Sequence, residues 1–260
     1  MRYSDMKKLF KKTVCGVLAI ASSVASIGLF TACETNKPEV EIQLQFNGTK
    51  YTLDYTLYRE VAPKTVAHFL ALAENEYYNN LCIHDYSGAK MIGGVYSYVE
   101  GGEDGGLVYK DYYATVKSEE FKNFSHSVWN DEAKTDPLYT VYGEFADNKF
   151  KVTNGALTQT LGSLSMYYND LDTEAQVIVS RADGTGTSWK AYKYNCATSA
   201  FAIALDGTEK AASASYCTFG KLDDSSKDEL NDLLAAIEAY ISCHYIEVGF
   251  PLQVCSFRKR

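Results

Sequence analysis

The sequence predicts a mainly β protein, a closed antiparallel β-barrel that is capped by two α-helices and interrupted by two long irregular segments. Three observations support this fold class: an opening β-hairpin, two amphipathic helices, and many short strand patterns with turn residues between them. Closing the sheet into a barrel removes the exposed edges that so many short strands would otherwise leave. With 260 residues, of which 46% are hydrophobic, the chain is long enough to bury a substantial core.

The opening hairpin is predicted at residues 40–57. Apolar and polar residues alternate over 40–46 and again over 51–57, which is the period of half-buried strands. Asn47 and Gly48 lie between the two runs, and this dipeptide is the strongest short-range signal for a two-residue hairpin turn.

The first helix is predicted from Pro63 to about Asn75. Proline suits the first turn of a helix, because the N–H that it lacks has no intrahelical partner there. Apolar residues at helical spacing define one buried face and leave His68 on the exposed side of the helix. The residues of the buried face are Val66, Phe69, Leu70 and Ala73.

The last helix is predicted to begin after Ser226. Ser226 and Glu229 have the spacing of a capping box, in which each side chain accepts a hydrogen bond from the backbone N–H of the other residue. After this helix, a final strand over about 252–257 completes the predicted sheet. A short helix is also predicted earlier in the chain, at 118–124. The apolar stripe of the last helix consists of Leu230, Leu233, Leu234, Ile237 and Ile241.

Residues 1–32 have the pattern of an export signal, with five basic residues ahead of an uncharged apolar run. The run ends in small residues before Cys33, which resembles the lipobox of bacterial lipoproteins. The sequence therefore predicts a signal peptide over 1–32, a lipid on Cys33, a tether over 33–39 and a folded domain over 40–260. The alternative is a transmembrane anchor, because about 18 apolar residues can span a bilayer. Either anchor places the domain outside the cytoplasm.

The charge of the chain argues against a nucleic-acid partner. The formal net charge is −8, whereas nucleic-acid binding needs clustered Lys and Arg. Removal of the signal takes away five basic residues and Asp5, so 25 basic and 33 acidic residues become 20 and 32, a net charge of −12. Charge alone therefore disfavours docking on anionic lipids.

Neither the cysteines nor the acidic residues predict a metal site. Five cysteines follow Cys33, an odd number without C-x-x-C spacing, which argues against zinc and against a full disulfide framework. Cys243 and Cys255 either pair with each other or remain buried thiols. Acids alternate over 169–174 as in calcium loops, but the glycine of the sharp turn is absent, which favours a solvated loop.

Several segments resemble, in chain order, those of the cyclophilin family of peptidyl-prolyl isomerases. The family reads roughly Phe-His-Arg, four further residues, and Phe-Met-Ile-Gln-Gly-Gly where this chain has Ile83–Gly94. Ala62–Phe69 and Gly162–Met166 are the other strong matches. The resemblance implies a cyclophilin-like barrel with two insertions in this chain, at about 96–139 and 167–194.

The resemblance also assigns candidate site residues. Asp85 stands where the family has its catalytic arginine. The family's substrate-binding positions fall on His84, Lys90, Met91, Gly93, Ala200, Phe201, Ala202 and Tyr216, and of these His84, Met91 and Phe201 keep the family's residue types.

Isomerisation of an X-Pro bond crosses a barrier of roughly 18–20 kcal/mol and needs no nucleophile, metal or cofactor. It needs a pocket for the proline and a donor that stabilises the twisted amide, for which a guanidinium is suited and a carboxylate is not. The resemblance thus implies a peptidyl-prolyl isomerase domain that acts on proline-containing segments of exported proteins, with weakened or lost catalysis. The alternative is a non-catalytic lipoprotein that binds a peptide or partner on a cyclophilin barrel.

Overall fold

The computed structural model of the chain describes residues 36–99, 106–118, 120–150, 157–168, 175–180, 186–207, 216–244 and 252–259. The predicted signal, Cys33 and the acidic segment 169–174 lie outside these residues. No helix in the described part of the chain has the length and apolar character needed to cross a membrane.

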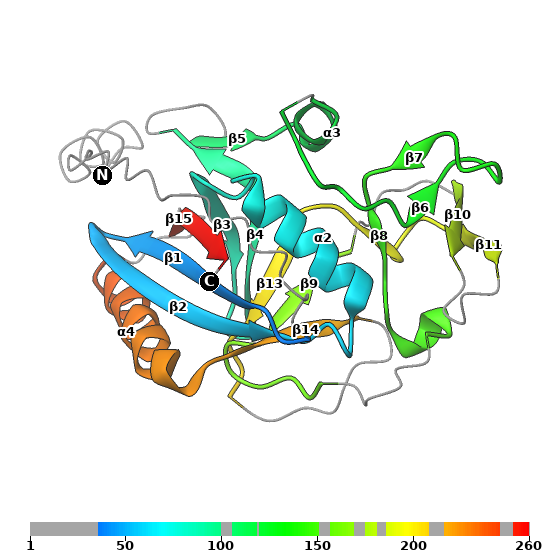
Figure 1. The fold of residues 1–260 in the computed structure, drawn as a ribbon. Coiled ribbons are helices and arrows are strands. Elements are labelled where there is room, and N and C mark those ends of the chain that lie inside the picture. The colour runs from blue at the N-terminus through cyan, green and yellow to red at the C-terminus, as the bar shows by residue number, and fades with distance from the viewer. Residues whose placement is uncertain are drawn as a thin grey trace, which may run out of the picture.

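Nine antiparallel strands of the described chain form the main sheet, in the order β13-β9-β14-β2-β1-β15-β3-β4-β5. β13 also pairs with β4, so the sheet returns on itself and leaves β5 outside the circuit (Figure 1). The predicted mainly β, antiparallel barrel is confirmed. The strands are β1 (Glu39–Phe46), β2 (Thr49–Leu57), β3 (Leu81–Tyr86), β4 (Lys90–Tyr98), β5 (Leu107–Tyr109), β9 (Leu164–Met166), β13 (Phe201–Ala204), β14 (Thr218–Leu222) and β15 (Leu252–Lys259).

The opening hairpin has the predicted turn. β1 pairs with β2 along its whole length, from Glu39 opposite Thr56 to Phe46 opposite Thr49. Asn47 and Gly48 have φ angles of 48° and 81°, the left-handed conformation that a tight hairpin turn of this kind requires. The alternating burial of both strands directs Ile42, Leu44 and Leu53, among others, into the core.

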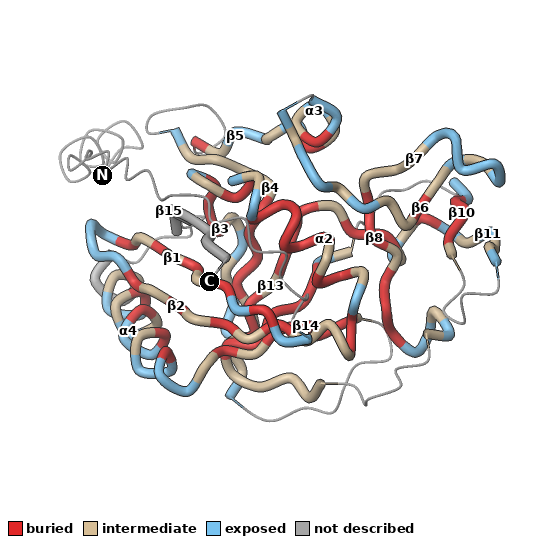
Figure 2. Tube along the Cα trace, in the orientation of Figure 1, coloured by how far each residue is buried: buried red, intermediate tan, exposed pale blue. Residues whose placement is uncertain are grey.

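Helix α2 (Pro63–Glu74) packs its apolar face against the barrel, as predicted. Phe69 is fully buried, and its ring lies 5.0 Å from that of Phe219, 5.3 Å from Tyr78 and 6.2 Å from Phe201. These aromatic rings therefore join the helix to strands β13 and β14. Figure 2 shows the buried residues concentrated where α2 crosses the sheet.

The prediction that His68 lies on the exposed side of α2 is wrong. His68 is 5% exposed, its Nε2 is hydrogen-bonded to the carbonyl of Thr198, and its ring packs edge-on against Phe124. Burial lowers its pKa from 6.5 to about 4, so the ring is neutral at pH 7. A segment 56 residues downstream covers this side of the helix, and helical periodicity carries no information about such a cover.

Helix α4 (Lys227–His244) follows a single 3-10 turn, η3 (Asp224–Ser226), and buries Leu230, Leu233 and Ile237. The predicted capping box is not formed. Instead, Ser226 Oγ accepts a hydrogen bond from Asp54 N–H (2.9 Å), and Glu229 Oε1 accepts one from Thr52 N–H (3.2 Å).

Both partners lie on β2 beyond the stretch that pairs with β14, which begins at Tyr55. The two side chains therefore satisfy backbone donors of β2 that β14 does not reach, and they tie the start of α4 to the barrel.

The helix predicted at 118–124 is also wrong, because the short helix α3 lies earlier, at Tyr112–Val116. Asp111 determines where it begins, since its carboxylate accepts a hydrogen bond from Ala114 N–H at 3.0 Å. Phe121 and Phe124 lie in the irregular chain beyond α3 and pack against the main core. The described chain thus has three α-helices: the two predicted to cap the barrel, and α3.

The two insertions are not independent loops. β6 (Val128–Trp129) and β7 (Pro137–Leu138) come from the first, β10 (Gln176–Ser180) and β11 (Thr187–Ala191) come from the second, and they form one sheet in the order β11-β10-β6-β7. We call this the insertion sheet. It lies beside the barrel in Figure 1 and has its own small apolar cluster. The cluster contains Val128, Val177, Val179, Tyr192 and Cys196.

The remaining short elements link the two parts. β8 (Val141–Tyr142) pairs with β12 (Cys196–Ala197), and the 3-10 turn η2 (Ala146–Asn148) follows β8. Between β8 and η2, the buried carboxylate of Glu144 accepts hydrogen bonds from the N–H groups of Lys64 (3.1 Å) and Thr65 (2.8 Å). Glu144 thereby fixes the N-terminus of α2.

Candidate functional site

The candidate site is centred on the end of β3, where Asp85 is exposed. The register between β3 and β4 shifts twice, the second time between Ile83 and Asp85, and beyond that shift Asp85 lies opposite Ile92. An irregularity of this kind changes the direction in which the following side chains point, and bulges of this type are common beside functional sites.

Asp85 begins a row of residues that crosses five strands on one face of the sheet. Asp85 is opposite Ile92, Ile92 is opposite Ala202, Ala202 is opposite Ser165, and Ser165 is opposite Thr218. Because directly opposite residues of antiparallel strands share a face, we call these five residues the outer row. Within it Asp85 is exposed, Ala202 is half-buried, and Ser165 and Thr218 are bonded to each other through their hydroxyls at 3.2 Å.

Three of the predicted substrate-binding residues face the other way, into the barrel. Met91 and Phe201 are fully buried in the main apolar cluster. Gly93 lies opposite Phe201, and a Cβ on Gly93 would come within 2.7 Å of Ile83 Cδ1. Glycine is therefore needed here for the close packing of two strands, and the structure places all three residues in the core rather than beside Asp85.

His84 lies beside Asp85 on β3 and is half-buried. Its ring packs edge-on against Tyr96, with centroids 5.0 Å apart, and Tyr96 in turn contacts Tyr109. Among the residues that the structure describes, its buried Nδ1 finds no hydrogen-bond partner. Burial lowers the pKa of His84, and the negative charge of Asp85 opposes that shift.

Lys90 is on the same face of β4 as Ile92, two residues away. Its ammonium group lies 4.7 Å from the ring centroid of Tyr167, an exposed residue directly after β9. Tyr167 is held in place because its N–H donates to the carbonyl of Ala200, at 2.9 Å. Lys90, Tyr167 and Ala200 therefore border the outer row on one side.

Tyr216 lies just before β14, two residues from the end of the outer row at Thr218. Its hydroxyl donates a hydrogen bond to Gln159 Oε1 at 3.0 Å. The structure thus places Asp85, Lys90, Ala200, Ala202 and Tyr216 on or next to one surface.

Ile92, a buried member of the outer row, and the exposed Tyr167 also belong to this site, and neither is among the site residues predicted from the sequence. Alternation along β4 carries the signal for Ile92, because a residue next to the buried Met91 has to point to the opposite face. For Tyr167, the signal is its position one residue beyond the family-like segment that ends at Met166.

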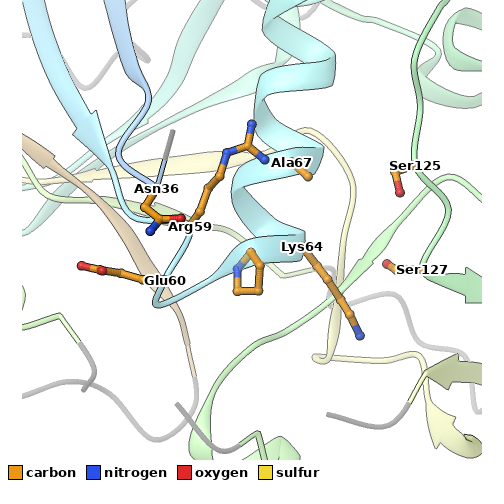
Figure 3. A pocket seen from close by; sticks show the side chains of 8 residues that line it. Asn36, Arg59, Glu60, Lys64, Ala67, Ser125 and Ser127 are labelled. Atoms are coloured by element: carbon orange, nitrogen blue, oxygen red, sulfur yellow. The ribbon is translucent and has the colours of Figure 1, made fainter. Parts of the chain in front are cut away.

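A pocket of about 420 Å³ lies elsewhere, beside the first turns of α2 (Figure 3). None of the predicted substrate-binding residues lines it. Its lining consists of Asn36, Arg59, Glu60, Pro63, Lys64, Ala67, Ser125 and Ser127. Among the residues that the structure describes, no three His, Cys, Asp or Glu side chains are grouped closely enough to hold a metal ion.

The chemistry available at the outer row follows from its residue types. An ionised carboxylate accepts hydrogen bonds and donates none, so Asp85 is unable to donate to an amide nitrogen. Of its apolar neighbours in the row, Ala202 is half-buried, whereas Ile92 is only 3% exposed. The accessible part of the row therefore consists of one carboxylate acceptor and one small apolar side chain.

One comparison with known proteins identifies the family of this chain. Residues 41–241 match the family model described as cyclophilin type peptidyl-prolyl cis-trans isomerase/CLD. A cyclophilin-type isomerase from Cryptosporidium parvum is 18% identical with a TM-score of 0.46, and the match covers 86% of this chain and 98% of that one. The Mimivirus cyclophilin is 14% identical with a TM-score of 0.43, and here the match covers 88% and 92%. A search of curated proteins finds no match. Since the family model spans most of its length, the chain belongs to the cyclophilin-type peptidyl-prolyl cis-trans isomerase family.

Proposed function

We propose that this cyclophilin is lipid-anchored through Cys33 on the extracytoplasmic face of a bacterial membrane. There it binds proline-containing segments of exported proteins and isomerises them weakly or not at all. The observation that carries the proposal is Asp85, an exposed carboxylate at the family's arginine position and directly opposite Ile92.

The reason is electrostatic. In the twisted amide the nitrogen loses its resonance with the carbonyl and becomes a better hydrogen-bond acceptor, so a donor beside it lowers the barrier. A carboxylate in the same place repels that electron density. Loss of one such donor costs on the order of 3 kcal/mol, or roughly a hundredfold in rate. Binding depends instead on apolar side chains near Asp85, of which Ala202 is half-buried, and it is affected less.

The alternative is a partner-binding protein in which the barrel serves as a scaffold. The insertion sheet supports this reading, because Trp189 on β11 is 48% exposed and Tyr194, just beyond β11, is 60% exposed. Both are large aromatic side chains of the kind that serve as binding anchors.

Two measurements on the wild-type protein separate these functions. A protease-coupled assay on a short Ala-Pro peptide measures turnover, and NMR titration with an uncleavable Ala-Pro peptide measures binding. Binding with a rate close to the uncatalysed one is the expected result. A rate far above background would overturn the weakened-enzyme proposal, and absence of any binding would favour the scaffold alternative.

A further inference from the structure

The chain enters the folded domain at a fixed point. Asn36, the first described residue, accepts a hydrogen bond from Arg59 N–H at 2.9 Å, and Pro38 accepts one from Leu57 N–H at 2.8 Å. Both contacts join the start of the domain to the β2–α2 connection. The ammonium group of Lys37 also lies 5.3 Å from the ring centroid of Tyr58 in the same connection.

The distance from this point to Cys33 is short. Only Glu34 and Thr35 separate Cys33 from Asn36. Three Cα–Cα steps of about 3.8 Å span at most about 11 Å when fully extended. The headgroup region of one leaflet is roughly 5–8 Å thick, so a lipid on Cys33 holds Asn36 within or just above the headgroups.

The surface around this entry point is polar. We call it the anchor surface and define it by Asn36, Lys37, Tyr58, Arg59, Glu60 and Lys64. The pocket in Figure 3 opens within it, and there Arg59 extends along α2 toward Ala67 while Lys64 points the other way. The large exposed apolar side chains of the described chain lie elsewhere: Val99, Val108, Tyr109, Tyr167, Trp189 and Tyr194.

This composition suits hydrated headgroups and not the hydrocarbon layer. The side chains of the anchor surface are mostly charged or polar, so moving them into hydrocarbon would not lower their free energy. Its three cations, Lys37, Arg59 and Lys64, are offset by Glu60 and by the neighbouring Glu34 and Glu39, so net charge does not attract it to anionic lipid. The short tether is what holds it there, by keeping its local concentration at the membrane high.

We infer that the anchor surface is the membrane-facing side of this protein and rests against phospholipid headgroups. The inference rests on the proposed lipid at Cys33.

Two lysines of the opening hairpin can report on this orientation. β1 is eight residues long, so the far end of the hairpin lies roughly 26 Å from Asn36 along the strand. Lys37 and Lys50 thus form a matched pair, because both are exposed lysines and they lie near opposite ends of one hairpin.

The test uses the full-length protein reconstituted in phosphatidylethanolamine–phosphatidylglycerol vesicles. A water-soluble acetylating reagent modifies exposed lysines, and mass spectrometry gives the ratio of the acetylation rates of Lys37 and Lys50. A variant with ten Gly and Ser residues inserted between Thr35 and Asn36 keeps the anchor but frees the domain. We expect the Lys37-to-Lys50 ratio to be at least threefold lower for the native tether than for the long one.

Equal ratios for the two tethers would overturn the inference. The mass of the N-terminal peptide tests the anchor separately, because a lipid adds a defined mass to Cys33. An unmodified Cys33 would refute the anchoring and this inference together. A lipidated Cys33 with equal ratios would refute the membrane-facing surface alone.

Discussion

Asp85 and Ile92 lie directly opposite each other on β3 and β4, and Ile92 lies opposite Ala202 on β13. An exposed carboxylate thus lies opposite a buried isoleucine and near the half-buried Ala202, at the position that the family resemblance aligns with an arginine. Met91 and Phe201, which keep the family's residue types, are instead buried in the core. The barrel is retained in this chain, and the proposed reversal of charge at Asp85 has consequences that can be measured.

His68 is predicted to make the fold acid-sensitive. Its pKa is about 4 in the folded protein and near 6.5 when unfolded, so the unfolded chain takes up the proton more readily. Stability is therefore lost as pH falls from about 6.5 to 4, by up to about 3 kcal/mol. His68→Gln keeps a donor for the Thr198 carbonyl but does not titrate, so urea unfolding at pH 7 and pH 4.5 should show a smaller loss. An identical loss in both proteins would contradict this role.

Ser226 is predicted to tie α4 to the edge of β2. Ser226→Ala leaves the N–H of Asp54 without its acceptor and should lower the free energy of unfolding by about 1–3 kcal/mol. The adjacent, exposed Ser225 provides the matched control, and Ser225→Ala should change stability by less than about 0.5 kcal/mol. Equal midpoints for the two variants in urea unfolding would mean that the Ser226 bond does not stabilise the fold.

The insertion sheet is predicted to unfold as a unit separate from the barrel. Both tryptophans of the chain, Trp129 and Trp189, lie in it, so intrinsic tryptophan fluorescence reports on this sheet. Val177→Ala removes buried methyl groups from its cluster and should destabilise it by about 1–3 kcal/mol.

The fluorescence midpoint in urea should then fall while the far-UV circular dichroism midpoint of the barrel stays unchanged. Val40→Ala, a core substitution in β1, should lower the circular dichroism midpoint. If Val177→Ala shifts both signals together, the barrel and the insertion sheet form one cooperative unit.

The sequence was sufficient for the elements whose signals are local. The hairpin at Asn47–Gly48 depends on a two-residue turn, and α2 depends on Pro63 and a helical apolar pattern, so both could be predicted from neighbouring residues. The barrel class followed from the number of short strands and from the family resemblance.

What the sequence could not predict depends on contacts between distant segments. His68 is buried because Phe124 covers it, and Ser226 bonds β2 rather than the next turn of its own helix. The insertion sheet joins residues about fifty positions apart. At the candidate site, the register shift before Asp85 decides which residues share its face, and no local pattern encodes it.

The most direct test of the proposed loss of catalysis is kcat/KM for an Ala-Pro peptide in the wild type and in Asp85→Arg. The new guanidinium would restore a permanent donor on the face that carries Ile92 and Ala202, so we expect a gain of at least about tenfold over a wild type that is close to background. Asp147→Arg makes the same charge change on an exposed turn outside the outer row and should have no effect. A wild type that is already fast, or a rate that Asp85→Arg leaves unchanged, would contradict the account.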